Sequence, residues 1–151
     1  YREGDELTRW LDEPVRVIEV PGHDQGQLAL MPDSRAWCIV GDLIQGIGTV
    51  VIAPPEGNMR VYFESMKKII ALAPAVVIPS HGGALGTTYR IREALKHREQ
   101  REAQVFTLHT AGRTEDQMLD EIYQGTPPVL LPLARINIQS HLTKLREEGR
   151  V

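Results

Sequence analysis

Residues 15–42 read VRVIEVPGHDQGQLALMPDSRAWCIVGD, and this stretch determines the expected fold. A β-branched run at residues 15–20 predicts a strand that ends at a Pro-Gly turn, and His23 follows this turn directly. A second apolar run at residues 36–40 leads in the same way into Asp42. The pattern predicts two strands of one sheet, each with a metal-binding type of side chain just past its carboxyl end.

A third strand of this kind is predicted at residues 75–79 and runs into the sequence Ser-His-Gly-Gly. Pairing in one sheet would bring its His81 to the same edge as His23 and Asp42, and imidazole and carboxylate groups are ligands that zinc prefers. Each residue alone has a plainer interpretation, because a turn histidine is often a surface residue and a Gly-Asp pair often caps a turn. The three residues in this order favour a metal site.

The same segments carry a resemblance to a known family. The sequences VPGHDQGQLAL, CIVGDLIQGIGTVVIAPPEGN and VVIPSHGGAL resemble the second half of a metallo-β-lactamase-fold hydrolase, and nearly the whole chain is covered. The branch is that of glyoxalase II-like enzymes and endoribonucleases with a small C-terminal winged-helix domain. The resemblance implies that His23, Asp42 and His81 are metal ligands. The family's other signature, H-x-H-x-D-H, does not occur in this sequence, so we expect a C-terminal fragment with half of a two-metal site.

The resemblance also implies metal-assisted hydrolysis with two zinc ions. In such a site the residue matching Asp42 bridges the metals as the catalytic carboxylate, whereas those matching His23 and His81 belong to different metals. A hydroxide held between the metals is the nucleophile, because zinc lowers the pKa of bound water to about 7. The expected substrate is a small-molecule thioester or ester, with an RNA phosphodiester as the alternative. This chain alone would hold zinc weakly or not at all and would be inactive.

The expected fold class is α/β (α+β), in two parts. The resemblance assigns residues 1–88 to the C-terminal half of an αββα metallo-β-lactamase sandwich, and residues 89–151 to a connecting helix and a winged-helix-like domain with a truncated wing. In the first part, a Pro-Asp-Ser turn joins strands at 27–31 and 36–40 into a hairpin that is apolar enough for burial on both faces. Residues 1–13 are charged and are expected to be turn-like.

Two helices are predicted between the strands and the tail. Asn58 is the expected N-cap of the first, in which apolar residues recur at helical spacing up to Pro74. A longer helix starts near Tyr89 and stops at Gly112. Its alternating arginines and glutamates at residues 98–102 predict a solvated, salt-bridged face.

The tail after residue 113 is expected to be a separate helical unit. Thr114 and Gln117 form a capping-box pattern at its start, and a last helix directs a set of residues inward, namely Ala134, Ile138, His141, Leu142 and Leu145. As a recognition helix it could contact phosphate through His141, Lys144 and Arg146, although two glutamates follow at once. The alternative to an enzyme is therefore a non-catalytic binding or association module, including nucleic-acid binding by this tail.

Composition narrows the possible functions further. With 17 Lys+Arg against 20 Asp+Glu the net charge is −3, which gives no electrostatic attraction to nucleic acid or to an anionic membrane. The single cysteine, Cys38, cannot form an internal disulfide and lies in an apolar run, so we expect a buried structural residue. No signal peptide or membrane-length apolar run occurs, which predicts a cytoplasmic protein without a membrane partner.

The expected partner follows from the half-sandwich. In the family fold, two sheets pack face to face, so the strands at residues 15–20 and 36–40 would leave an apolar inner face uncovered. A large apolar patch and free strand edges favour association. We therefore expect this face to be covered by the missing N-terminal half of the domain or by a second copy of the chain, which would form a homodimer.

Overall fold

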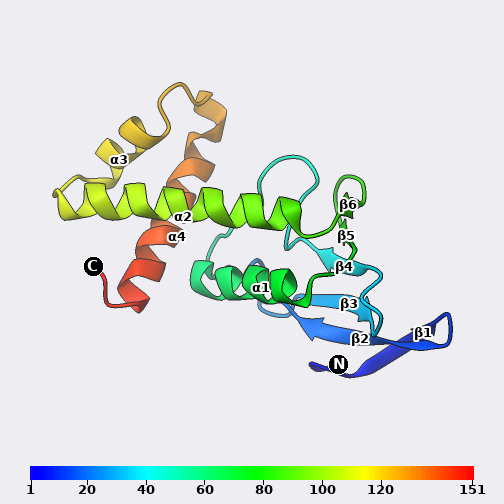
Figure 1. Cartoon of the computed structure of the whole chain (residues 1–151). Helices are drawn as coiled ribbons and strands as arrows, with labels where there is room; N and C mark the ends of the chain where they lie inside the picture. Colours follow the sequence, from blue (N-terminus) through cyan, green and yellow to red (C-terminus); the bar gives the residue numbers. More distant parts are fainter.

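The computed structural model describes residues 1–151 as a six-stranded sheet with four α-helices (Figure 1). The strands follow one another across the sheet in chain order: β1 (Glu6–Trp10), β2 (Glu13–Glu19), β3 (Leu28–Pro32), β4 (Cys38–Gly41), β5 (Val76–Pro79) and β6 (Leu85–Gly86). Only β4 and β5 are parallel neighbours. Since β3 is antiparallel to both β2 and β4, the strands β2, β4 and β5 run in one direction and end at one edge of the sheet.

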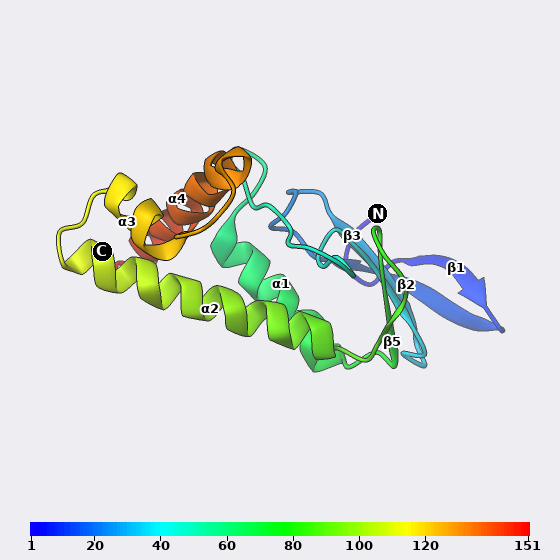
Figure 2. The same ribbon diagram turned by 90° about the horizontal axis from the view of Figure 1, so that it is seen from above.

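The helices form a second layer and an extension beyond it. They are α1 (Met59–Leu72), α2 (Tyr89–Thr110), α3 (Glu115–Ile122) and α4 (Leu131–Glu147), and a short 3₁₀-helix, η1 (Pro128–Leu130), precedes α4. Figure 2 shows α1 and α2 on one side of the sheet and α3 at the far end of α2, while Figure 1 shows α4 crossing α2. None of these helices combines the length and apolar character needed to span a membrane.

Two hydrophobic cores share the helix α2. The larger core contains 18 buried residues between the sheet, α1 and the first turns of α2, where Ile91 and Leu95 pack. The smaller core contains seven buried residues from α3, α4 and Val105 of α2. The long helix therefore connects the sheet layer to the helical tail through packed side chains at both of its ends.

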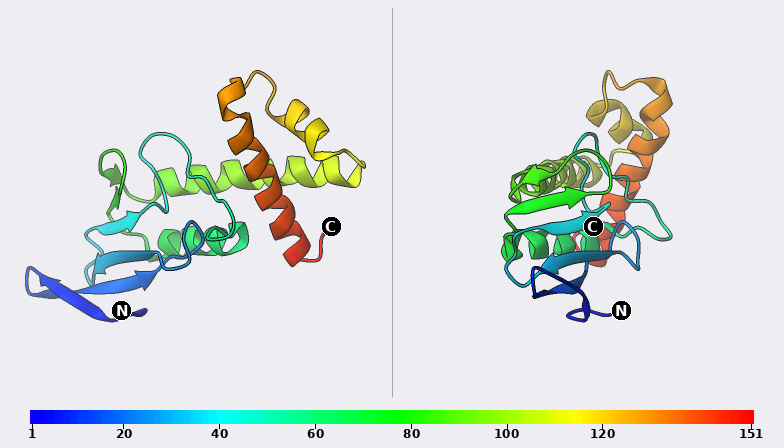
Figure 3. Two further views of the ribbon diagram at one scale, coloured as in Figure 1. Left: turned by 180° about the vertical axis from the view of Figure 1, so that it is seen from behind. Right: turned by 90° about the vertical axis from the view of Figure 1, so that its right-hand side faces the viewer.

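The sheet face away from the helices is open over β3 to β5. The strand register places Val17, Leu30, Ile39 and Ile78 in one row across β2 to β5 on this face. Val17 is buried, whereas Leu30 and Ile78 are half-buried. The right-hand view of Figure 3 looks onto the sheet with the helices behind it. Ile39 is 40% exposed and Leu28 is 38% exposed. The expected burial of the hairpin strands on both faces is therefore wrong for this chain, because no second layer of the chain covers this side.

The expectation of a turn-like start is also wrong, since residues 6–10 form strand β1. This strand has no apolar alternation, and four of its five residues are exposed. It forms because its backbone pairs with β2 across a hairpin, and because Trp10 packs edge-on against Trp37 with ring centroids 5.7 Å apart. Backbone pairing of this kind leaves no periodic signal in the side chains.

The predicted helix ends are confirmed. The Asn58 side chain accepts the backbone N–H of Val61 at 3.0 Å, which caps α1. At the start of α3, the Thr114 hydroxyl accepts the Gln117 backbone N–H at 3.3 Å, and the Gln117 side chain accepts the Thr114 N–H at 2.9 Å. Gly112, with φ of +76°, lies just past the end of α2.

The polar face of α2 is only partly solvated, contrary to the expectation from its charges. Arg98 is 4% exposed and Glu102 is 6% exposed, because α4 packs across this part of α2. Glu102 accepts hydrogen bonds from Lys144 at 2.9 Å and from Arg150 at 2.8 Å. These charges join α2 to α4 and to the C-terminal residues.

Candidate functional site

The carboxyl ends of β4 and β5 bring Asp42 and His81 together. The parallel register pairs Gly41 with Pro79, so the residues that follow lie side by side. The Asp42 Oδ1 atom is 3.6 Å from the His81 Nε2 atom. The Ser80 hydroxyl donates a hydrogen bond to the same carboxylate oxygen and so fixes its orientation. The His81 side chain is 69% exposed and that of Asp42 35%, which leaves the pair accessible to a ligand.

His23 lies past the end of β2 and has a different partner. Its Nδ1 atom is 3.0 Å from the Val51 carbonyl oxygen. A carbonyl only accepts, so Nδ1 carries the proton and Nε2 keeps a free lone pair. Metal-binding histidines are commonly prepared in this way, by donating the other ring N–H to a carbonyl or carboxylate. No three His, Cys, Asp or Glu side chains lie close enough together to hold a metal, so His23 does not complete a site with Asp42 and His81.

The Pro-Gly turn before His23 is held by α1. Gly22 has φ of +125°, and a Cβ atom there would lie 2.3 Å from the backbone nitrogen of Tyr62. Its carbonyl accepts the N–H of Asn58 at 2.9 Å, and the Ser65 hydroxyl donates to the Pro21 carbonyl at 2.6 Å. A side chain at position 22 would separate the turn from the helix, so the glycine is needed for this close approach.

A second close approach joins the loops that carry Asp42 and His81. The backbone N–H of Gly46 donates to the His81 carbonyl at 3.0 Å. A Cβ atom at Gly82 would lie 3.0 Å from the Cα atom of Gly46, and Gly82 has φ of +90°. The glycines around His81 thus allow the loop after β4 to pass against the loop after β5.

The helical tail holds the segment that orients His23. The Ser140 hydroxyl of α4 donates to the Ile52 carbonyl at 2.6 Å, and the Arg98 guanidinium of α2 donates to the Val50 carbonyl. Val51, the contact of His23, lies between these two anchored residues. Sequence reasoning missed this connection, because no local pattern relates Ser140 to a carbonyl 88 positions away.

Three other residues considered from the sequence have structural roles. Cys38 is fully buried, and burial raises its thiol pKa to about 12, so the expected structural role is confirmed. His141 is 0% exposed and Lys144 is 6% exposed, and both face Glu102 of α2. The expected phosphate contacts of His141 and Lys144 are wrong, because α4 turns these two side chains toward α2, whereas Arg146, the third residue of that expectation, is exposed.

Comparisons with known proteins agree with this fold. Residues 114–151 match the family model of the beta-lactamase associated winged helix domain. The structure resembles a beta-lactamase domain protein from Burkholderia ambifaria with a TM-score of 0.81 at 23% identity, covering 99% of this chain and 47% of that one. The chain therefore has the fold of the C-terminal half of a metallo-β-lactamase-superfamily protein, followed by a winged-helix domain.

The chain is also similar in sequence to individual proteins. Beta-lactamase-like protein 2 homolog of Drosophila melanogaster is 32% identical over 142 residues, which are 91% of this chain and 47% of that protein. Hydroxyacylglutathione hydrolase of Bdellovibrio bacteriovorus is 33% identical over 79 residues, which are 51% of this chain and 30% of that protein. The chain spans about half the length of the fly protein that it matches.

Proposed function

We propose that this chain forms part of a metal-dependent hydrolase in which His23, Asp42 and His81 are metal ligands. The observation that carries the proposal is the carboxylate-imidazole pair of Asp42 and His81, 3.6 Å apart at the ends of two parallel strands. The hydrogen bond from His23 to Val51 supports it, because it leaves Nε2 free for a metal. Relatives of this chain include a hydrolase and structures of the metallo-β-lactamase superfamily.

Zinc is the metal that this donor chemistry fits best, since imidazole and carboxylate are its usual nitrogen and oxygen ligands. The side chains of this chain do not form a set of three donors, so further ligands from outside it would be needed. When bound, zinc supplies a water molecule acidic enough to act as a nucleophile at neutral pH. This chain contributes Asp42 and His23 as ligands. Ser80 fixes the orientation of the Asp42 carboxylate, and Val51 orients the His23 ring.

The proposed substrate is a thioester or ester of a small molecule. The name of one relative, hydroxyacylglutathione hydrolase, is that of an enzyme acting on an acylated thiol compound, and this supports the thioester. RNA phosphodiester hydrolysis is the alternative within the same chemistry. Nucleic-acid binding by α4 has less support, because His141 and Lys144 are buried.

A non-catalytic association module is the second candidate, and the open sheet face favours it. On β3 to β5 this face carries Leu30, Ile39 and Ile78, which are half-buried or exposed. We propose that it packs against an apolar partner layer, either an N-terminal half of the same domain or a second copy of the chain. Association through this face is compatible with catalysis, and only an activity measurement separates the two functions.

The test is hydrolysis by the protein expressed from its complete reading frame. We expect hydrolysis of an acylated glutathione, tested beside a single-stranded RNA, and a loss of at least about a hundredfold in kcat for Asp42→Asn, because the amide removes a charge that holds the cations. Asp120→Asn on the exposed side of α3 is the matched control and should retain full activity. Equal activity of wild type and Asp42→Asn would contradict the proposal, and absence of hydrolysis in metal-loaded wild type would favour the association module.

A further inference from the structure

None of the four arginines of α2 has a carboxylate partner, and all except the exposed Arg92 are buried or half-buried. Arg98 is 4% exposed, and its contacts are two oxygens of uncharged groups, a methionine sulfur and an aromatic ring. The Nε atoms of Arg90 and Arg101 are buried without any hydrogen-bond partner. By comparison, Arg16 and Arg60 each pair with a carboxylate. A buried cation without a counterion is costly, so this pattern points to a negatively charged ligand.

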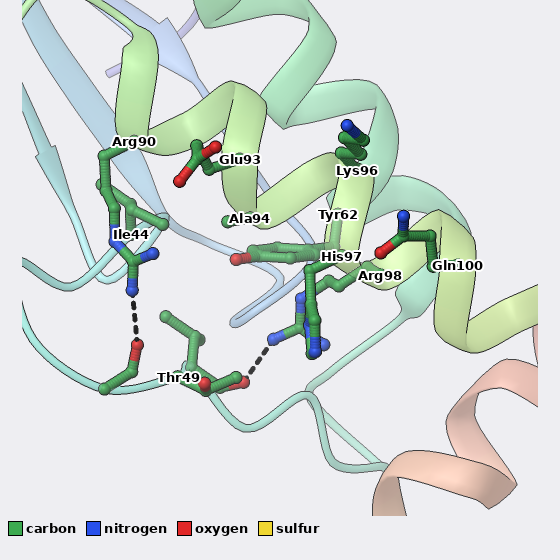
Figure 4. A pocket seen from close by; sticks show the side chains of 12 residues that line it. Ile44, Thr49, Tyr62, Arg90, Glu93, Ala94, Lys96, His97, Arg98 and Gln100 are labelled. Atoms are coloured by element: carbon green, nitrogen blue, oxygen red, sulfur yellow. Dashed lines mark hydrogen bonds between the residues drawn. The ribbon is translucent and has the colours of Figure 1, made fainter. Parts of the chain in front are cut away.

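Arg90 and Arg98 line a cavity of about 470 Å³ between α2 and the loop at residues 48–50 (Figure 4). Both guanidinium groups reach toward this loop, and each donates a hydrogen bond to one of its backbone carbonyls. The ring of Tyr62 lies between them, while the carboxylate of Glu93 lies farther from the loop. The side of the cavity next to the loop therefore carries two positive charges and no negative one.

His97 lines the same cavity, and the positive charge there affects the pKa of its imidazole. Burial lowers the pKa of its imidazole, and the charges of Arg101, Arg98 and Arg90 lower it further. Figure 4 shows the His97 ring directed toward the loop beside Thr49. A neutral imidazole can donate one hydrogen bond to an anion and becomes easier to protonate once the anion is bound.

An apolar cavity of about 500 Å³ adjoins the first one. The two share the loop residues 48–50 and His97. The second is lined on its apolar side by Ile52, Leu130 and Leu133, of which Leu130 and Leu133 are 45% and 44% exposed. Arg101, which lies over the Tyr123 ring at 4.5 Å, borders it as well. A charged pocket that continues into an apolar one fits a ligand with an anionic end and an apolar body.

We propose that the pocket between α2 and residues 48–50 binds a phosphoryl dianion, with the apolar part of the ligand in the adjoining cavity. Two guanidinium groups match the charge of a phosphoryl group, which is about −1.5 to −2 at neutral pH, better than that of one carboxylate. The Nε donor of Arg90 has no hydrogen-bond partner within the protein. This site goes beyond the proposed hydrolysis, because it contains none of the proposed metal ligands and needs no metal.

The experiment is calorimetric titration of inorganic phosphate and of phenyl phosphate into the chelator-treated protein from the complete reading frame. The metal is removed and the titration is repeated with Asp42→Asn, so that the measured phosphate binding does not come from the metal site. We expect saturable binding that weakens with salt, tighter for phenyl phosphate, and weakened about tenfold or more by Arg90→Gln, which removes a charge-assisted donor. Arg90→Lys should keep part of the affinity.

Arg92→Gln is the matched control, because it removes the same charge two residues away at an exposed position bonded to Thr88. It should bind as wild type does. In a sample with ¹⁵N-labelled arginine, phosphate should shift the Nε resonance of Arg90 and leave that of Arg92 in place. Equal loss in both variants, unshifted Arg90 resonances, or acetate binding as tightly as phosphate would each overturn the proposal. Loss of phosphate binding in Arg90→Gln with hydrolysis retained would support this site independently of the proposed function.

Discussion

Glu102 lies where α2, α4 and the C-terminal residues meet, and three basic side chains surround it. Lys144 is 2.8 Å from its carboxylate, Arg150 is 2.8 Å away, and the His141 Nδ1 atom is 3.6 Å away. Burial alone would raise the pKa of Glu102, but its interactions with His141 and Lys144 outweigh burial and lower the pKa to about 2. The carboxylate therefore stabilises the fold in its ionised form.

This cluster predicts how stability depends on pH. The pKa of Glu102 in the folded protein is below its usual value of 4.5, so its contribution is complete above pH 4.5 and is lost as pH falls toward 2. The pKa of His141 is lowered from 6.5, first by burial, so protonation of this ring also favours unfolding as pH falls. Denaturant titrations should show a free energy of unfolding that decreases steadily with acidification below neutral pH.

Glu102→Gln should lower the free energy of unfolding at pH 7 by about 3 kcal/mol, because the buried Lys144 loses its buried carboxylate partner and keeps only the more exposed Glu148. The variant should also lose most of the decline below pH 4.5. Glu99→Gln, on the exposed side of the same helix and 4.0 Å from Lys67, should change stability by less than about 0.5 kcal/mol. Similar small effects in both variants would show that the cluster does not stabilise the fold.

At the level of single residues, the sequence predicts contacts that depend on strand ends and misses those that depend on tertiary packing. Asp42 and His81 lie together because β4 and β5 are parallel and each ends just before its polar residue. The placement of His23 on Val51, and the hydrogen bond from Ser140 to the neighbouring carbonyl, arise only when α4 packs on the loop. A side chain that bonds to a distant backbone carbonyl leaves no pattern in the sequence.

Helix α1 packs directly against the turn before His23. Gly22→Ala should lower the free energy of unfolding by about 3 kcal/mol, because its Cβ would meet the backbone of Tyr62 and its φ is +125°. Gly26→Ala, in the same loop, meets only the side chain of Asp24 at 3.5 Å and should cost less than about 1 kcal/mol. Equal melting temperatures for the two variants would contradict the close approach of α1.

The segment at residues 50–52 is a link between the helical tail and His23. Ser140→Ala removes the hydrogen bond to the Ile52 carbonyl and should cost about 1 kcal/mol. It should also loosen the Val51 contact, so the ¹⁵N resonances of the His23 ring should move toward values for mixed tautomers. Thr143→Ala, at an exposed position of the same helix, is the control and should leave them unchanged. Unchanged ¹⁵N resonances of the His23 ring in Ser140→Ala would contradict this connection between the helical tail and His23.

Among the elements, those with their own capping and periodic signals were predictable. Helix α1 has its Asn58 cap and α3 its capping box, and both begin where the sequence indicates. Strand β1 has neither, because its residues are exposed and only backbone pairing to β2 defines it. The burial of Arg98 and Glu102 was not predictable from α2 alone, since the charges that face α4 and those that face solvent have the same helical spacing.

At the scale of the whole molecule, the sheet has one covered and one open face. On the open face, Ile39 is 40% exposed and Leu28 is 38% exposed. These two residues belong to the apolar side chains that neighbouring strands place on this face. The 151-residue chain on its own should therefore self-associate, and light scattering after size-exclusion chromatography should give a mass above 16.9 kDa. Ile39→Lys should reduce the association, whereas Val129→Lys, exposed on the distant tail, should not. A monodisperse monomer for the wild-type chain would contradict this expectation.

The metal content of the protein shows whether Asp42 and His81 are metal ligands. The protein from the complete reading frame is treated with chelator, reloaded with zinc, desalted and measured by elemental analysis, beside His81→Ala, Asp42→Asn and the control His109→Ala. We expect stoichiometric zinc in wild type and control, a clear loss in the two site variants, and weak or absent zinc in the 151-residue chain alone, which has no set of three donors. Zinc content unchanged by His81→Ala and Asp42→Asn, or tight stoichiometric zinc in the 151-residue chain, would contradict this expectation.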